Sequence, residues 1–222
     1  MAALATPILA ILRPLGAVIT VLLAVARVLA VILLALMVVA ILLQITFRYG
    51  VGDALNWTEE AARFGMLWMT GLMAPVAYRH GGFVAIDMLE RALPPRTAAL
   101  LVLLLTTVSL IVILYALPLA RAHVQSGCLF RSSTLWLPFS TQISLPLWPG
   151  TDLTLCAGDG PKFGFEWGWN KMPLAVTYAS LYVGLQLLLL VAVETVLRAL
   201  ATLLGAADRL PLLPVTDEPV AE

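Results

Sequence analysis

Charged residues are scarce in this chain. They make up 12% of its 222 residues, about half the share of an ordinary soluble domain. The 13 Lys and Arg balance the 13 Asp and Glu, and there are only two Cys and two His. So little charge cannot cover a water-facing surface, and a net charge of zero gives no electrostatic reason to bind nucleic acid. Disorder is excluded too, because it requires low hydrophobicity and a high net charge.

Apolar residues dominate instead, at 61% of the chain, with a mean hydropathy of +0.98. About 20 consecutive apolar residues cross the ~30 Å hydrocarbon core of a bilayer as a helix. Continuous runs of this kind predict an all-α integral membrane protein with four transmembrane helices, over residues 28–47, 58–78, 97–120 and 172–193. A further apolar run, 15–26, either extends the first helix or lies at the membrane interface.

Four spans place both termini on the same side of the membrane. The short connection 79–96 carries three Arg and the short connection 48–57 carries one, so the positive-inside rule predicts cytoplasmic termini. An amphipathic segment, Phe83–Leu93, is expected to lie flat in the inner interface between the second and third spans. Residues 211–222 are expected to be a disordered tail.

The long connection 122–170 then lies outside the membrane. It holds both cysteines, Cys128 and Cys156, which can form a disulfide in an oxidising compartment; two unrelated buried thiols are the alternative. The connection also holds four of the six Trp. We therefore expect an ordered insert that rests its Trp on the bilayer interface or on a partner protein.

Polar residues gather around the start of the second span. Trp57 is a natural interfacial anchor, and Glu59 and Glu60 lie four and three residues before Arg63, at the spacing of helical ion pairs. Arg48 precedes the span. We interpret Arg48, Glu59, Glu60 and Arg63 as an ion-pair cluster that ties the first span to the second. A well-capped span without such a cluster explains the same residues.

Other positions within the spans indicate helix packing. Trp68 lies in the middle of the second span, so it either packs between helices or faces a partner. Glu194 and Arg198 have the spacing of a local salt bridge. Small residues four apart allow close helix approach, and such pairs are Ala61 with Gly65, Ala175 with Ala179, and Ser180 with Gly184.

Groups that carry chemistry are missing from the expected spans. Outside the first turn of the second span, no charged residue or His lies near the middle of a span, although such groups mark ion and proton pathways. His80 and His123 are expected on opposite sides of the bilayer and cannot share a haem iron. No Cys or His cluster suits zinc, and no Gly-rich phosphate loop is present. We expect no enzymatic activity, no cofactor and no metal.

The segment from Phe47 to Leu89 adds a resemblance. It contains Phe47-Arg48-Tyr49, then Trp57-Thr58-Glu59-Glu60 with Arg63, Trp68 and Gly71, then Arg79-His80-Gly81-Gly82 with Asp87. This pattern resembles the small membrane subunit of tripartite ATP-independent periplasmic (TRAP) transporters, the DctQ family. The resemblance implies that Arg48, Glu59, Glu60 and Arg63 form a structural cluster near the outer face. It also implies that Arg79, Gly82 and Asp87 form a turn at the inner face.

The resemblance also implies partners. A large membrane permease subunit would carry the substrate and sodium sites, and a periplasmic binding protein would deliver an organic acid to it. The small subunit would support the permease within the lipid of the bacterial inner membrane. The long third connection departs from the family pattern, and our hypothesis is that it enlarges the outer surface offered to a partner. A membrane anchor or scaffold for another assembly is the alternative function, and a small transporter acting alone as an oligomer is a third.

Overall fold

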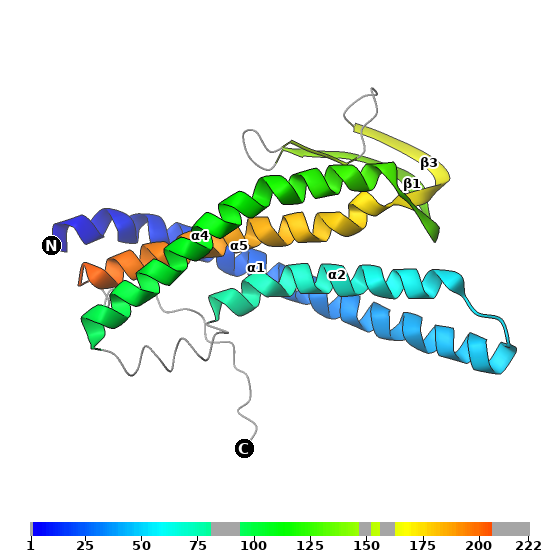
Figure 1. Cartoon of the computed structure of the whole chain (residues 1–222), viewed down its shortest axis with the longest axis horizontal. Coiled ribbons are helices and arrows are strands. Elements are labelled where there is room, and N and C mark those ends of the chain that lie inside the picture. Colours follow the sequence, from blue (N-terminus) through cyan, green and yellow to red (C-terminus); the bar gives the residue numbers. More distant parts are fainter. Residues whose placement is uncertain (1, 81–93, 147–151, 156–162, 206–222) are drawn as a thin grey trace, which may run out of the picture.

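The helices lie side by side in one elongated bundle, with a small sheet toward one end (Figure 1). The structure is a computed structural model that describes residues 2–80, 94–146, 152–155 and 163–205. Its elements in chain order are α1 (Ala2–Thr46), the π-helical turn η1 (Phe47–Val51), α2 (Asn56–Arg79), α4 (Pro95–Ser126), the 3-10 turn η2 (Gly127–Leu129), β1 (Arg131–Pro146), β2 (Asp152–Leu155), β3 (Phe163–Pro173) and α5 (Leu174–Leu203).

The first helix is much longer than the predicted span 28–47. α1 runs without interruption for 45 residues, which is about 68 Å at ~1.5 Å per residue. The apolar run 15–26 therefore extends the first helix. Arg27, which separates that run from the predicted span, does not interrupt α1 because arginine is a good helix former.

Three of the described helices are long and apolar enough to cross a bilayer. They cover Ile8–Val51, Thr97–Leu129 and Leu174–Leu203. The second expected span, 58–78, corresponds to α2, which is not one of these three. The predicted segment Phe83–Leu93 and the tail 211–222 lie outside the described residues.

α5 lies between the α1–α2 pair and α4 (Figure 1), and it contacts all three of these helices. One apolar cluster joins α4 to α5 through Ala120, Val124, Ala175, Ala179 and Tyr182. Two further clusters join α1 to α2, and one of them also includes Val191 of α5. Most apolar side chains along α1 and α4 instead point outward, including Val31 and Leu104, each 60% exposed.

The described chain is mostly helical, as predicted, but the connection between α4 and α5 contains a sheet that the all-α prediction did not include. β2, β1 and β3 form an antiparallel sheet with β1 in the middle. The β1–β3 register shifts between Leu137 and Phe139, on either side of Pro138, which has no backbone N–H to donate. The insert begins later than predicted, because α4 continues to Ser126, and β3 leads directly into α5.

Candidate functional site

Three helices meet at a buried group of charged side chains, Arg79 of α2 with Glu194 and Arg198 of α5, which we call the ion-pair cluster. Arg79 Nη2 donates to Glu194 Oε1 at 3.0 Å, and Arg79 Nε lies 3.0 Å from Glu194 Oε2. Arg198 Nε and Nη2 donate to the same Oε1 at 3.1 and 2.8 Å. The side chains of Arg79 and Glu194 are 4% and 1% exposed. The pair is therefore almost wholly removed from solvent.

The ion-pair cluster is also attached to α1. Arg79 Nη1 donates to Thr20 Oγ1 at 2.8 Å, and Arg79 Nη2 donates to the Gly16 carbonyl at 3.2 Å. A Cβ added at Gly16 would lie 3.3 Å from Glu194 Oε1, so glycine leaves room for the carboxylate there. One guanidinium therefore joins α1, α2 and α5.

This cluster differs from what the sequence predicted. Glu194 and Arg198 do form the expected local salt bridge, but Arg79 joins them across 115 positions of sequence. Arg79 was expected to form a turn with Gly82 and Asp87, and both of those residues lie outside the described part of the chain. α1, α4 and α5 together contain one carboxylate, Glu194, and both of its oxygens face arginine nitrogens.

At the other end of α2, the predicted four-residue cluster does not form. Arg63 Nη2 donates to Glu59 Oε1 within α2, and both side chains are exposed. Glu60 turns instead to the sheet, where its Oε2 accepts from the Thr134 backbone N–H at 3.1 Å and from the Thr134 hydroxyl. Arg48 lies in η1, is exposed, and makes no ion pair with a described carboxylate. Glu60 thus ties α2 to the insert rather than to α1, whereas Glu59 pairs within α2.

The helices approach one another most closely where α2 crosses α5. A Cβ added at Gly71 would lie 2.5 Å from the Ser180 carbonyl oxygen, and one added at Gly184 would lie 2.6 Å from the Gly71 carbonyl oxygen. Trp68, one turn before Gly71, donates its indole N–H to the Val176 carbonyl at 3.1 Å. Trp68 and the Ser180–Gly184 pair are thus used for packing within the chain.

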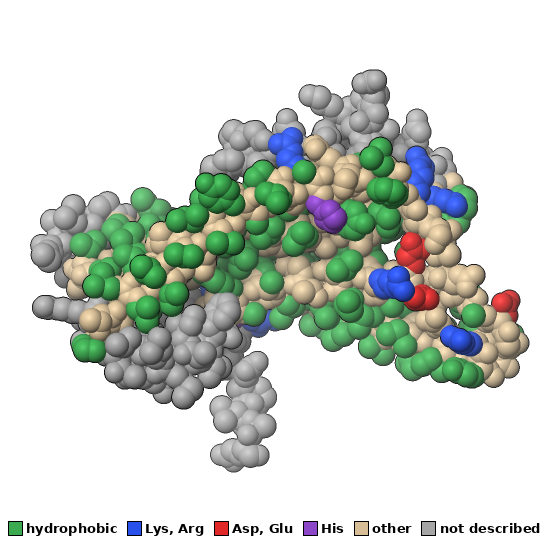
Figure 2. All heavy atoms as spheres, in the orientation of Figure 1, with side chains coloured by type: hydrophobic (Ala, Val, Ile, Leu, Met, Phe, Trp, Pro, Cys, Tyr) green, Lys and Arg blue, Asp and Glu red, His purple; other side chains and the backbone are tan. Residues whose placement is uncertain are grey.

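Aromatic and basic side chains are exposed where the sheet begins, a surface that we call the outer patch. Lys171 Nζ lies 5.7 Å from the centroid of the Trp136 ring, within the range of a cation–π contact. Trp169 is 72% exposed, and Leu129 of η2 and Phe130, which precedes β1, are 83% and 61% exposed. Figure 2 shows that many of the charged side chains on the visible face gather toward this end, whereas apolar side chains cover much of the rest.

The remaining predicted residues are placed only in part. Trp57 is 41% exposed near the start of α2, and its role as an interfacial anchor stays a prediction. Cys128 lies in η2 and is disulfide-bonded, whereas Cys156 lies outside the described residues, so the bridge between the two stays a prediction. Within the described ranges, no group of three His, Cys, Asp or Glu residues is placed to hold a metal ion.

Long apolar helices with outward-facing apolar side chains define a multi-pass membrane protein. The sequence profile of the DctQ component of tripartite ATP-independent periplasmic transporters matches residues 37–151, about half of the chain. The chain belongs to the DctQ family of TRAP transporter components, which is a family of transport components rather than enzymes. The resemblance seen in residues 47–89 is therefore confirmed.

A curated relative from Haemophilus influenzae is named, provisionally, as a TRAP transporter small permease protein. It is 31% identical over 61 residues, which is 28% of this chain. The match spans 38% of the length of that relative. No solved structure matches the chain.

Proposed function

We propose that the chain is the small membrane subunit of a TRAP transporter and that it supports a large permease subunit rather than carrying solute itself. In this proposal α2 is a fourth span beside α1, and both termini are cytoplasmic in the bacterial inner membrane. The length of α2, 24 residues, corresponds to about 36 Å and is sufficient to cross the hydrocarbon core.

The observation that carries the proposal is the pairing of charge inside the chain. Ionisable side chains that are free to bind or titrate at membrane depth mark many ion and proton pathways. Glu194 instead faces two arginines and is 1% exposed. The outward surfaces of α1 and α4 are apolar, which suits contact with lipid or with another membrane protein.

Two finer assignments rest on family membership. The permease partner would take up an organic acid with sodium, and a periplasmic binding protein would deliver that acid. The outer patch, with Trp136, Trp169 and Lys171 exposed, is a surface of the kind that protein partners use. A disulfide between Cys128 and Cys156 would close this insert and would require the oxidising side of the membrane.

Co-purification and reconstitution test the proposal. The tagged full-length chain is purified in mild detergent from its own membranes, and a large multi-span permease should accompany it. Sodium-driven uptake in proteoliposomes should require both subunits together with the binding protein. If the chain alone accumulates solute, the supporting role is wrong, and if it instead accompanies an assembly without a permease, the anchor function is correct.

Deleting Leu129–Trp169 tests the insert separately. The deletion removes Trp136, Trp169 and Thr134 and leaves Lys171 without its aromatic partner, so uptake should fall while membrane insertion and co-purification with the permease persist. A scrambled insert of equal length that keeps Cys156 at its position is the control for connection length. Unchanged uptake by the deletion variant would show that the insert has no part in docking.

A further inference from the structure

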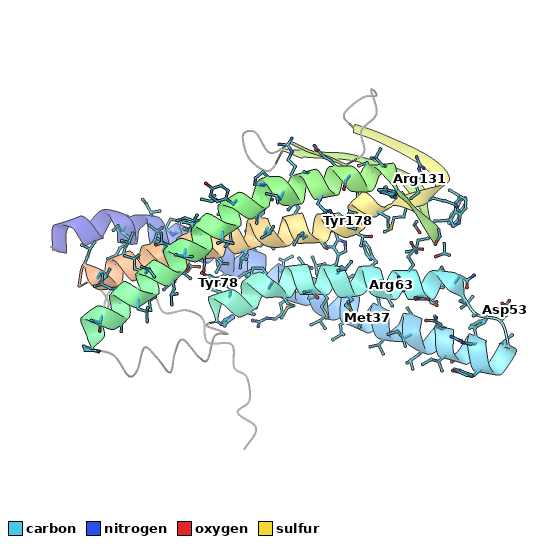
Figure 3. The ribbon with its side chains drawn as sticks, viewed as in Figure 1. Met37, Asp53, Arg63, Tyr78, Arg131 and Tyr178 are labelled. Carbon is cyan, nitrogen blue, oxygen red and sulfur yellow. The ribbon has the colours of Figure 1, made fainter. Side chains whose placement is uncertain are left out.

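An apolar groove lies between α1 and α2, in the half of the pair nearer the connecting turn. Its volume is about 270 Å³. Ten residues line it, five of which are Met37 and Ala40 of α1 with Trp57, Ala61 and Gly65 of α2; the rest are Leu, Val and Phe. Met37 lies on α1 beside α2 (Figure 3). A groove without a polar wall suits a hydrocarbon chain and no polar ligand.

The side chain of Arg48 is a cation that lies beyond the end of this groove. Arg48 follows Met37 by eleven residues, close to three helical turns, so it lies on nearly the same side of the helix. It is exposed and pairs with no described carboxylate. Trp57 lines the groove at that same end and is 41% exposed. Trp and Arg side chains in such positions lie at the level of lipid headgroups.

We propose that the α1–α2 groove binds one acyl chain of a phospholipid and that Arg48 binds the phosphate of the same molecule. An apolar groove beside a cation that pairs with no described carboxylate is complementary to a molecule with a hydrocarbon tail and an anionic head. A helix of a partner protein would leave Arg48 without a counter-charge unless that helix supplied a carboxylate at this level. The phosphate of a lipid is present at this level by default.

Two lipids that differ only in the headgroup distinguish the contribution of the groove from that of Arg48. The delipidated full-length chain is titrated in detergent with dioleoylphosphatidylglycerol or with dioleoylglycerol, which lacks phosphate, and bound lipid is measured by native mass spectrometry. The chain should bind the phosphatidylglycerol about tenfold more tightly, the size expected of one charge-assisted hydrogen bond. Arg48→Gln should abolish this preference and leave dioleoylglycerol binding unchanged, whereas Ala61→Phe should weaken both about tenfold by filling the groove.

Matched variants control for charge and size. Arg63→Gln removes an exposed arginine at the same end of the molecule, and Ala62→Phe enlarges the neighbouring side chain of α2, which does not line the groove. Each of these two control variants should leave the affinities for phosphatidylglycerol and for dioleoylglycerol unchanged. The proposal is wrong if Arg63→Gln and Arg48→Gln change lipid affinity equally, or if Ala61→Phe and Ala62→Phe do so. It is also wrong if the Met37→Cys variant cross-links to the permease while no lipid binds. The titration uses the chain alone, so its result does not depend on the transporter assignment.

Discussion

Replacing Glu194 with glutamine removes the one negative charge of the ion-pair cluster. The substitution preserves size and one carbonyl oxygen, but it leaves Arg79 and Arg198 as two neighbouring cations that are 4% and 16% exposed. Breaking a buried ion pair by neutralising one partner costs about 3–5 kcal/mol, because the remaining charge is buried without compensation. We take about 3 kcal/mol as the expected loss, since glutamine still accepts one hydrogen bond.

For a chain of this size, each kcal/mol changes the melting temperature by about 2–4 °C. Glu194→Gln should therefore lower the melting temperature by about 6–12 °C in thermal unfolding followed by circular dichroism in detergent. The matched control is Glu59→Gln, which breaks the exposed pair with Arg63, and exposed pairs contribute little. That variant should remain within about 2 °C of the wild type.

A double variant tests whether Arg79 is the partner that matters. Because Arg79 and Glu194 are in contact, their substitutions should not be additive. Arg79→Gln combined with Glu194→Gln should be less destabilised than the sum of the two single variants. If Glu194→Gln and Glu59→Gln shift the melting temperature equally, or if the double variant is strictly additive, the cluster does not hold the three helices together.

Three further changes test the contacts between elements. Gly184→Leu should separate α2 from α5, because even a Cβ there would lie 2.6 Å from the Gly71 carbonyl oxygen; size-exclusion chromatography should show loss of the monodisperse peak. Glu60→Ala should release the sheet from α2 by removing the acceptor of Thr134, and limited proteolysis of the insert should become about tenfold faster. Trp68→Phe should lower stability by about 1 kcal/mol through loss of one hydrogen bond, measured as a melting temperature lowered by about 2–4 °C.

For each of these three substitutions, one outcome would contradict the prediction. A monodisperse Gly184→Leu variant with wild-type stability would mean that the helices do not cross at that glycine. Equal proteolysis of Glu60→Ala and Glu59→Ala would show that the carboxylate does not fix the sheet. If Trp68→Phe melts at the wild-type temperature, the indole contributes only apolar packing.

Helices were the part of the fold that composition could predict, because long apolar runs in a chain with little charge have few other solutions. The residues at which the helices end were harder to predict. Polar residues such as Arg121 and His123 suggested that the third span stopped at residue 120, yet α4 continues past both to Ser126. The limit of the hydrocarbon core and the end of a helix are different boundaries, and hydropathy reports the first.

The sequence contains a strand pattern in the connection between α4 and α5, but the Gly and Pro content of that connection made the pattern hard to recognise. Phe163, Phe165, Trp167 and Trp169 alternate with small or polar residues through β3, which is the period-two pattern of a strand. The many Gly and Pro around this pattern led to the prediction of an ordered insert without assigned strands. If the alternation of aromatic with small or polar residues had been given more weight than the neighbouring Gly and Pro, at least this strand would have been predicted.

The candidate site could be predicted only where partners are close in sequence. The pairs Glu59–Arg63 and Glu194–Arg198 follow from helical spacing, and both form. The contact between Arg79 and Glu194 depends on how three helices pack, which a single sequence does not specify. Arg48 was grouped with Glu59 and Glu60 because they flank the same turn.

The length of α1 has a mechanical consequence. A helix tilted by as much as 40° uses about 39 Å, or some 26 residues, to cross ~30 Å of hydrocarbon. The 45 residues of α1 therefore leave roughly 19 residues that cannot be accommodated at such a tilt. If the excess is at the amino-terminal end, one side of it is covered within the chain, because Leu12 and Ile19 are buried and Leu15 packs against the apolar cluster around Val191. The other side of the same stretch is apolar and open, since Ile11 and Val18 are 59% and 57% exposed. The headgroup layer or a neighbouring polypeptide must therefore cover that side, because a continuous apolar strip is unfavourable in water.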